Sequence, residues 1–162
     1  MNLIDIPQFI RTYITKREQS FFEADIAQNA AVLTEKIKGK SVLVIGGAGT
    51  IGASYIKEML AFEPGKLYVV DTNENGLTEL TRDLRSTDKQ FVPNDFKTYP
   101  MSFGDPVFKK MFVEEGPFHI VANFAAHKHV RSEKDKYSIE AMIENNVFKA
   151  KAFLDLLTQY KP

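Results

Sequence analysis

Cysteine is absent from this chain of 162 residues. Without it there is no disulfide, no thiolate nucleophile and no zinc site with cysteine ligands. An excess of charge of one sign is also missing, because 21 lysine and arginine residues balance 21 aspartate and glutamate residues. A protein without net charge has no overall field that attracts nucleic acid or an anionic membrane surface. We therefore expect neither as a partner.

Long apolar runs are missing as well. No stretch of the sequence approaches the roughly 18 consecutive apolar residues of a membrane-spanning helix. The first residues, MNLIDIPQFIRTYITK, carry acidic and polar side chains where a signal peptide has an unbroken apolar core. We expect a cytoplasmic protein with no membrane segment. The hydrophobic fraction of 44% is sufficient for one sizeable core.

Residues 1–39 predict an amphipathic helical arm. A first helix is expected around Pro7, which suits a first-turn position, and apolar residues follow it at helical spacing. A second helix is expected to begin at Ser20, where Glu23 stands three residues later as in a capping box. Gly39 is expected to end this second helix.

From residue 40 onwards, short apolar runs alternate with helical patterns. This alternation predicts an α/β fold, a Rossmann-type doubly wound parallel sheet of about four strands, with the first strand near its centre. The expected strands are Ser41–Ile45, Lys66–Asp71, Lys97–Ser102 and His119–Phe124. The expected helices are Ile51–Phe62, Gly76–Arg85, Pro106–Glu115 and Ser138–Tyr160. We thus predict two domains, the arm over residues 1–39 and the sheet domain over residues 40–162.

A glycine-rich segment, GGAGTIG, joins the first expected strand to the following helix. Gly47, Gly49 and Gly52 fit the pattern GxGxxG in the setting that a dinucleotide site requires. Glycines there permit a tight turn and a close approach of the backbone to a pyrophosphate, and the helix amino terminus presents free amides to it. The alternative is a strand-to-helix turn that binds no ligand.

Asp71 ends the second expected strand, 19 residues after Gly52. A carboxylate at this place accepts hydrogen bonds from an adenosine ribose and repels a 2′-phosphate, which favours NAD over NADP. NADP stays possible, because Arg82 and Arg85 are close in sequence. Asp71 is also open to a simpler interpretation, in which it only caps the turn DTNENG.

Three segments together resemble the extended short-chain dehydrogenase/reductase superfamily. Gly46, Gly49 and Gly52 fit its GxxGxxG pattern, VANFAAHKHVRSEKD is similar to its segment after the fourth strand, and ENNVFKAKAFLDLL is similar to its NNV helix. The combination most resembles the CapD-type polysaccharide biosynthesis proteins, which include UDP-N-acetylglucosamine 4,6-dehydratases and epimerases. The resemblance covers Lys40–Pro162 and leaves the helical arm outside.

The resemblance implies a role for each matching residue. The glycine segment would hold the pyrophosphate, Asp71 the adenosine ribose, and Ser102 and Phe103 would lie beside the adenine, although many relatives have aspartate at the position of Ser102. Ala125 and Ala126 would pass along the cofactor. Lys128 would reach the ribose or phosphates of the cofactor, and Asn146 would lie under the active site. The full set is Gly46, Gly47, Ala48, Gly49, Thr50, Ile51, Gly52, Asp71, Ser102, Phe103, Ala125, Ala126, Lys128 and Asn146.

Several of these residues have simpler interpretations. Ala125 and Ala126 could be small residues at a crowded strand end, Lys128 a solvated lysine, and Asn146 a solvent-facing residue. Asp105 followed by proline is best interpreted as a helix cap. His127 and His129 suggest a metal site, but no third ligand is close in sequence, so we predict none.

The catalytic pair of this superfamily is a tyrosine with a lysine four residues later, in which the lysine lowers the pKa of the phenol. None of the six tyrosines in the chain has a lysine at that position. The resemblance places this pair after a fifth strand, whereas the chain ends at LTQYKP. We therefore expect the cofactor half of a longer NAD-dependent nucleotide-sugar dehydratase or epimerase, with a UDP-sugar substrate and a homo-oligomeric state.

Two alternatives stay open at this point. The first is a stand-alone NAD-binding module without catalysis of its own, which the absence of the tyrosine-lysine pair favours. The second is an oxidoreductase that acts on another substrate.

Overall fold

The computed structural model describes residues 5–87, 90–128 and 135–161. The chain divides into two compact units, Met1–Glu35 and Lys36–Pro162. The domain boundary that we predict after residue 39 stays a prediction.

The amino-terminal unit is helical, as the sequence predicts. It contains α1 (Ile6–Phe9), the π-helical segment η1 (Ile10–Thr15), α2 (Glu23–Gln28) and the start of α3 (Ala30–Ile37).

The prediction of one helix beginning at Ser20 is wrong. The Ser20 hydroxyl accepts a bond from the amide of Phe22, 3.3 Å away, and the helix begins only at Glu23. A break follows at Asn29, whose side-chain amide donates to the carbonyl of Asp25 at 2.8 Å. The backbone amide of Asn29 donates to the same carbonyl at 3.1 Å, so side chain and backbone share one acceptor where the helix breaks.

The second unit is built on a four-stranded parallel sheet with the order β3-β2-β1-β4. This order confirms the predicted doubly wound topology with the first strand in the interior of the sheet. The strands are β1 (Ser41–Ile45), β2 (Lys66–Asp71), β3 (Asp95–Pro100) and β4 (Ile120–Asn123).

The predicted bounds are right for the first two strands and shifted for the third. β3 begins and ends two residues before the predicted bounds, since it spans Asp95–Pro100. Its first residue, Asp95, pairs with Lys66. Met101, Ser102 and Phe103 consequently belong to the loop after β3. The fourth strand is shorter than predicted by one residue at each end, since it spans Ile120–Asn123.

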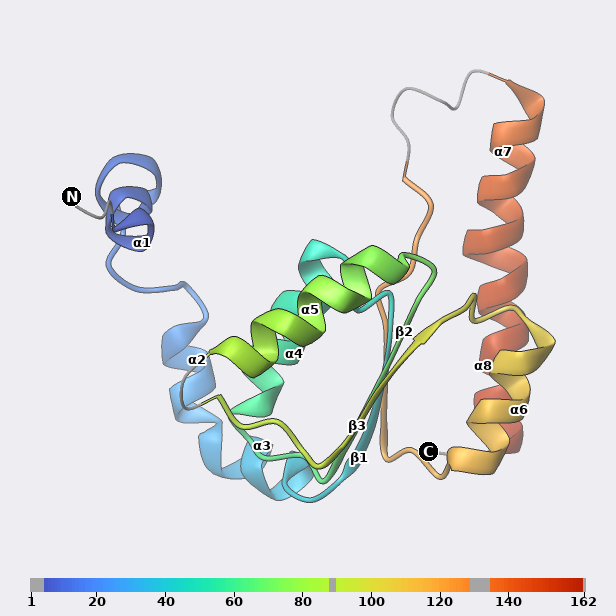
Figure 1. Ribbon diagram of the computed structural model, residues 1–162, viewed down its shortest axis with the longest axis horizontal. Coiled ribbons are helices and arrows are strands. Elements are labelled where there is room, and N and C mark those ends of the chain that lie inside the picture. The colour runs from blue at the N-terminus through green and yellow to red at the C-terminus, as the bar shows by residue number, and fades with distance from the viewer. Residues whose placement is uncertain (1–4, 88–89, 129–134, 162) are drawn as a thin grey trace. The chain divides into compact units, whose positions relative to one another are not determined.

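Helices cover both faces of the sheet (Figure 1). α4 and α5 lie on one face, and α6 and α8 lie on the other. The helices are α4 (Thr50–Leu60), α5 (Glu74–Ser86), α6 (Pro106–Glu115), α7 (Lys136–Ile143) and α8 (Ala150–Gln159), with the π-helical segment η2 (Glu144–Lys149) between the last two. The long helix predicted from Ser138 therefore begins earlier and contains a π-helical turn.

The core lies on both faces of the sheet. All of Val42 to Ile45 is buried, because both faces of the central strand are covered. On the side of α6 and α8, aromatic rings pack against Leu43 and Ile45, among them Phe108, Phe112 and Phe153. This apolar layer fixes the carboxyl ends of the strands, where the candidate site lies.

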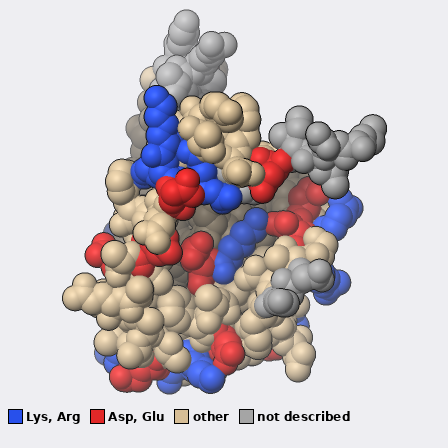
Figure 2. Space-filling view, turned by 90° about the vertical axis from the view of Figure 1, so that its left-hand side faces the viewer, with Lys and Arg blue, Asp and Glu red and all other residues tan. Residues whose placement is uncertain are grey.

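Charged side chains of both signs are mixed over the face shown in Figure 2. This distribution agrees with the formal net charge of zero. Among the residues that the structure describes, no helix combines the length and the apolar character needed to cross a membrane.

Candidate functional site

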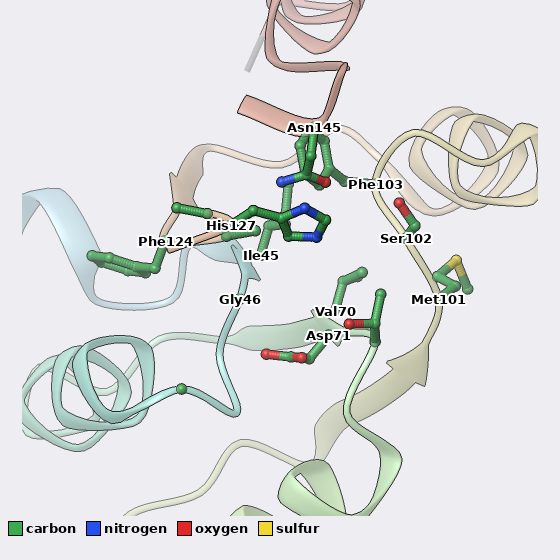
Figure 3. Close-up of a pocket in the computed structure, with 14 residues that line it drawn as sticks. Ile45, Gly46, Val70, Asp71, Met101, Ser102, Phe103, Phe124, His127 and Asn145 are labelled. Atoms are coloured by element: carbon green, nitrogen blue, oxygen red, sulfur yellow. The ribbon is translucent and has the colours of Figure 1, made fainter. Parts of the chain in front are cut away.

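A pocket lies at the carboxyl ends of the strands, where parallel α/β sheets bind their ligands. Figure 3 shows it between the glycine loop, the end of β2, the loop after β3 and the segment after β4. Its lining comprises Ile45, Gly46, Gly49, Val70, Asp71, Thr72, Met101, Ser102, Phe103, Phe124, Ala125, Ala126, His127 and Asn145.

Gly46 turns the chain sharply from β1 into the pocket. Its φ is +75°, a conformation that side chains disfavour, and its amide donates to the carbonyl of Val70 at 2.7 Å. A Cβ atom at this position would lie 2.5 Å from the backbone nitrogen of Ala125. Glycine at position 46 thus lets the loop after β1 and the segment after β4 approach each other along one wall of the pocket.

Gly47 and Gly52 have a packing role. A Cβ atom at Gly47 would lie 2.3 Å from the Val69 side chain, and one at Gly52 would lie 2.3 Å from the carbonyl oxygen of Gly46. Glycine at these positions therefore lets the loop pack closely on β2 and on the first turn of α4. Since α4 begins at Thr50, the amides of Thr50, Ile51 and Gly52 belong to the first turn, where backbone donors have no acceptor within the helix.

Asp71 connects β2 to the glycine loop. Its Oδ2 accepts a hydrogen bond from the amide of Ala48 at 3.0 Å, and its Oδ1 accepts one from the amide of Asn73 at 2.9 Å. The bond to Asn73 shows that Asp71 caps its own turn, as the simpler interpretation expected. The bond to Ala48 shows that the same carboxylate is held beside the glycine loop on the pocket wall.

The loop after β3 closes the other side of the pocket. Met101 and Ser102 lie across the pocket from Phe124 (Figure 3), and Phe103 is largely buried in the core. Asp105 stands at the N-cap position of α6 with Pro106 in the first turn, as predicted, but its side chain makes no cap bond to the helix. It accepts instead from the amide of Ser102 at 3.1 Å, which fixes the conformation of this loop.

The segment after β4 is held by an asparagine of η2. Oδ1 of Asn146 accepts from the amide of His127 at 2.9 Å, and its Nδ2 donates to the carbonyl of His127 at 3.0 Å. Asn146 is therefore outside the pocket lining and binds the backbone of a residue that is part of it. The neighbouring Asn145 is buried, lines the pocket and donates to Oδ1 of Asn146 at 3.1 Å.

The pocket brings together half of the residues that the sequence predicts for it. These are Gly46, Gly49, Asp71, Ser102, Phe103, Ala125 and Ala126. The other half do not line it: Gly47 and Gly52 support the loop, Ala48 donates to Asp71, Thr50 and Ile51 start α4, Lys128 is exposed, and Asn146 holds His127.

Sequence reasoning missed seven residues of the lining. Most adjoin a predicted residue or end a strand, so the strand ends were the available signal: Ile45, Val70, Thr72, Met101, Phe124 and His127. Asn145 carried a weaker signal, its place beside Asn146 in the NNV helix. It faces the pocket from the π-helical turn, which helical spacing alone does not predict.

A metal site finds no support in the ranges that the structure covers, where no three His, Asp or Glu side chains converge as ligands. His127 lines the pocket, whereas His129 lies outside the described residues.

The residues of the sheet and the pocket match a known family. The family described as "Polysaccharide biosynthesis protein" matches residues 42–161. The chain belongs to this family. The match covers the sheet, the pocket and the last helices, and it confirms the resemblance to the CapD-type proteins.

Individual relatives agree with this assignment. "Probable polysaccharide biosynthesis protein EpsC" of Bacillus subtilis is 26% identical over 136 residues, which are 84% of this chain and 22% of EpsC. "Capsular polysaccharide biosynthesis protein CapD" of Staphylococcus aureus is 27% identical over 124 residues, which are 75% of this chain and 20% of CapD. The chain thus spans about a fifth of the length of these curated relatives.

Among solved structures, the enzyme WbmF of Bordetella bronchiseptica, in complex with NAD+ and UDP, is similar to this chain with a TM-score of 0.56. The sequences are 23% identical, and the match covers 78% of this chain and 34% of WbmF. This likeness shows a shared Rossmann-type fold.

Proposed function

We propose that this chain supplies the dinucleotide-binding part of an NAD-dependent nucleotide-sugar dehydratase or epimerase of polysaccharide biosynthesis. The observation that carries the proposal is the Asp71 carboxylate, held 3.0 Å from the amide of Ala48 at the wall of the pocket. Family membership supports the biosynthetic context, and WbmF, a protein of the same fold, is known with NAD+ and UDP.

The residues of the pocket fit an extended dinucleotide. Side chains at Gly46, Gly47 and Gly52 would clash with their surroundings, and the first amides of α4 have no acceptor within the helix, which suits a pyrophosphate. Asp71 would accept bonds from the hydroxyl groups of the adenosine ribose. Ser102 and Phe103 would lie beside the base, and Ala125 and Ala126 would leave space along the cofactor.

A nicotinamide cofactor held by these residues would supply reversible hydride transfer with the sugar. In that reaction, the residues of this chain would bind and orient the cofactor. Asn146 fixes the backbone at His127, which keeps the segment after β4 at the pocket wall. Proton transfer from the sugar hydroxyl requires a tyrosine-lysine pair that this sequence does not contain, so the proposal assigns that step to residues outside this chain.

A stand-alone NAD-binding module is the second candidate, and the missing tyrosine-lysine pair favours it. The two candidates differ in turnover. In the first, UDP-N-acetylglucosamine or a related UDP-sugar is converted once the catalytic pair is present. In the second, NAD binds and no UDP-sugar is converted in any assembly that contains this chain.

Cofactor binding is tested by calorimetric titration of the protein with NAD and NADP. We expect tighter binding of NAD, because the Asp71 carboxylate repels a 2′-phosphate. The substitution Asp71→Ala should lower the affinity for NAD by about tenfold or more, since a hydrogen bond to a charged group contributes about 1.5–3 kcal/mol. It should lower the affinity for NADP less.

Asp71 also accepts a hydrogen bond from the amide of Ala48 in the glycine loop. A second variant therefore distinguishes the loss of ligand contacts from the loss of this bond to the loop. Asp71→Asn keeps an acceptor oxygen for Ala48 and removes the charge, and it should raise NADP affinity relative to NAD. Asp155→Ala serves as the control, because Asp155 pairs with Lys151 on the exposed side of α8. Equal affinity of the unmodified protein for NAD and NADP would defeat the assignment of Asp71.

A further inference from the structure

The π-helical segment η2 contacts both walls of the pocket. At its start, Asn145 lines the pocket, and Asn146 binds the backbone of His127 in the segment after β4. At its end, Nζ of Lys149 lies 3.4 Å from Oγ of Ser102, a lining residue in the loop after β3. Figure 3 shows Asn145 between Ser102 and His127. The function proposed above makes no use of Lys149.

The other hydrogen bonds of the loop after β3 are local. The amide of Ser102 donates to Oδ2 of Asp105 at 3.1 Å, and the amide of Asp105 donates to the carbonyl of Ser102 at 3.0 Å. The amide of Gly104 donates to Oγ of Ser102 at 3.3 Å. These bonds shape the turn without attaching it to another part of the fold. Among the hydrogen bonds of the described residues, only the one from Lys149 joins positions 102–104 to a segment that is distant in sequence.

The aliphatic stem of Lys149 covers Gly104. A Cβ atom at Gly104 would lie 2.6 Å from Cδ, 2.9 Å from Cγ and 3.0 Å from Cε of Lys149. The stem therefore lies where a side chain at position 104 would be, while the ammonium group reaches the hydroxyl of Ser102. Nearby, the ring of Phe103 packs against Phe153 of α8, with 6.0 Å between the ring centroids. The last helical segments thus hold this turn through one polar and one apolar contact.

We propose that η2 fixes both walls of the pocket, with Lys149 as the positioning residue for the loop after β3. Lys149 acts through Ser102 and Gly104 and does not itself line the pocket. It keeps Met101 and Ser102 at the wall that they form. A ligand binds less tightly when it must first order this wall, so the loss of Lys149 weakens binding. The inference rests on the proposed function only in the choice of NAD as the ligand.

The test combines amide hydrogen exchange of the protein without ligand and calorimetric titration with NAD. In Lys149→Ala, the amides of Ser102 and Asp105 should exchange about threefold to tenfold faster, which is the range of one lost hydrogen bond. The affinity for NAD should fall by about twofold, because only the fraction of molecules with an ordered loop is ready to bind. The amide of His127 should exchange as in the wild type, since Asn146 holds it.

Gly104→Ala gives an independent variant for a double-mutant cycle. Its added methyl group would occupy the place of the Lys149 stem and should displace it, with the same effects on exchange and affinity. In the Lys149→Ala background that place is vacant, so Gly104→Ala should add little further effect. Lys149→Met keeps most of the stem without the donor and should show a smaller change, and it replaces Lys149→Ala if that variant does not fold. Lys151→Ala is the matched control, since Lys151 pairs with Asp155, and it should behave as the wild type.

The proposal is overturned if Lys149→Ala leaves the exchange of Ser102 and Asp105 unchanged, or if the effects of Gly104→Ala and Lys149→Ala add. It also fails if exchange rises while the affinity for NAD keeps its wild-type value. A lower affinity without faster exchange would overturn it too, because Lys149 would then contact the ligand directly. If the unmodified protein does not bind NAD, the proposed function fails, and the exchange rates still decide whether Lys149 holds the loop.

Discussion

At the scale of single residues, alanine substitutions at Gly39 and Gly46 distinguish the cost of backbone strain from the cost of a steric clash. Gly39 and Gly46 both have positive φ angles, +70° and +75°. A Cβ atom at Gly39 would meet nothing within 4 Å, whereas one at Gly46 would lie 2.5 Å from the nitrogen of Ala125. Alanine at Gly39 therefore introduces only the left-handed conformation, which costs about 1–2 kcal/mol.

Gly46→Ala adds a backbone clash to that strain, so we expect it to lower the free energy of unfolding by about 3 kcal/mol or more. Urea denaturation of both variants measures the difference. Similar midpoints for Gly39→Ala and Gly46→Ala would show that the two chain segments at Gly46 can move apart without cost. The pocket wall would then be less rigid than the structure indicates.

Glu115 gives a prediction on pH dependence. Its carboxylate accepts a 2.7 Å bond from the hydroxyl of Tyr68, and Lys97 lies 3.4 Å away. The bond from Tyr68 is the largest cause that lowers the pKa of Glu115, and the bond from Lys97 adds to it. Burial raises the pKa of Tyr68 well above its usual range, so this phenol stays protonated and able to donate.

A carboxyl group whose pKa is lower in the folded state stabilises the fold while it is ionised. This contribution is present above the unfolded pKa of about 4.3 and is lost as the pH falls through the folded value. Glu115→Gln should therefore destabilise the protein at pH 7, and the difference from wild type should shrink below about pH 4. Urea denaturation across this range measures it, and a difference that does not change with pH would contradict the assignment.

At the scale of elements, the start of α7 depends on one carboxylate. Asp135 accepts from the amides of Tyr137 and Ser138 at 2.9 and 3.1 Å, and from the hydroxyl of Ser138 at 2.7 Å. The Ser138 hydroxyl bond is the largest cause that lowers the pKa of Asp135. Asp135→Ala removes the N-cap, and we expect faster amide hydrogen exchange over the first turn of α7.

Asp135→Asn is the matched variant, because asparagine also caps helices and should preserve most of the protection. In the wild type, this protection should decrease as the pH falls through the lowered pKa of Asp135. Unchanged exchange in Asp135→Ala would show that packing of the helix, rather than its cap, determines where α7 begins.

At the scale of the whole molecule, the homo-oligomer that the sequence predicts stays a prediction. The last helices expose large apolar side chains, among them Ile143 on α7, Val147 on η2 and Leu154 on α8, which is 61% exposed. Where exposed apolar side chains form one continuous patch, a partner surface commonly covers them. If a second copy covers them, the sedimentation coefficient should rise with protein concentration, and Leu154→Lys should lower that association. A monomer at all concentrations would contradict the prediction.

Some features of the fold depend on neighbouring residues alone. The strand from Ser41 to Ile45, its glycine loop and the helix α6 begin and end where short-range patterns place them, because backbone hydrogen bonding and glycine geometry depend on neighbouring residues. The pattern does not predict the break at Asn29, because an apolar stripe at helical spacing runs through it. β3 was placed two residues late because its limits are set by pairing with β2, which a linear pattern does not contain.

The sequence by itself determined the α/β class, the interior position of the first strand and the glycine loop, since each follows from periodicity, turn chemistry and the handedness of crossovers. Only the tertiary structure decided which residues meet at the pocket. It brings Asn145 and His127 together from segments far apart in the chain, and it shows that Ala48 binds Asp71. It also places Lys149 over Gly104, at hydrogen-bonding distance from Ser102. Contacts of this kind depend on how helices pack on the sheet, and packing is decided by the whole core rather than by local sequence.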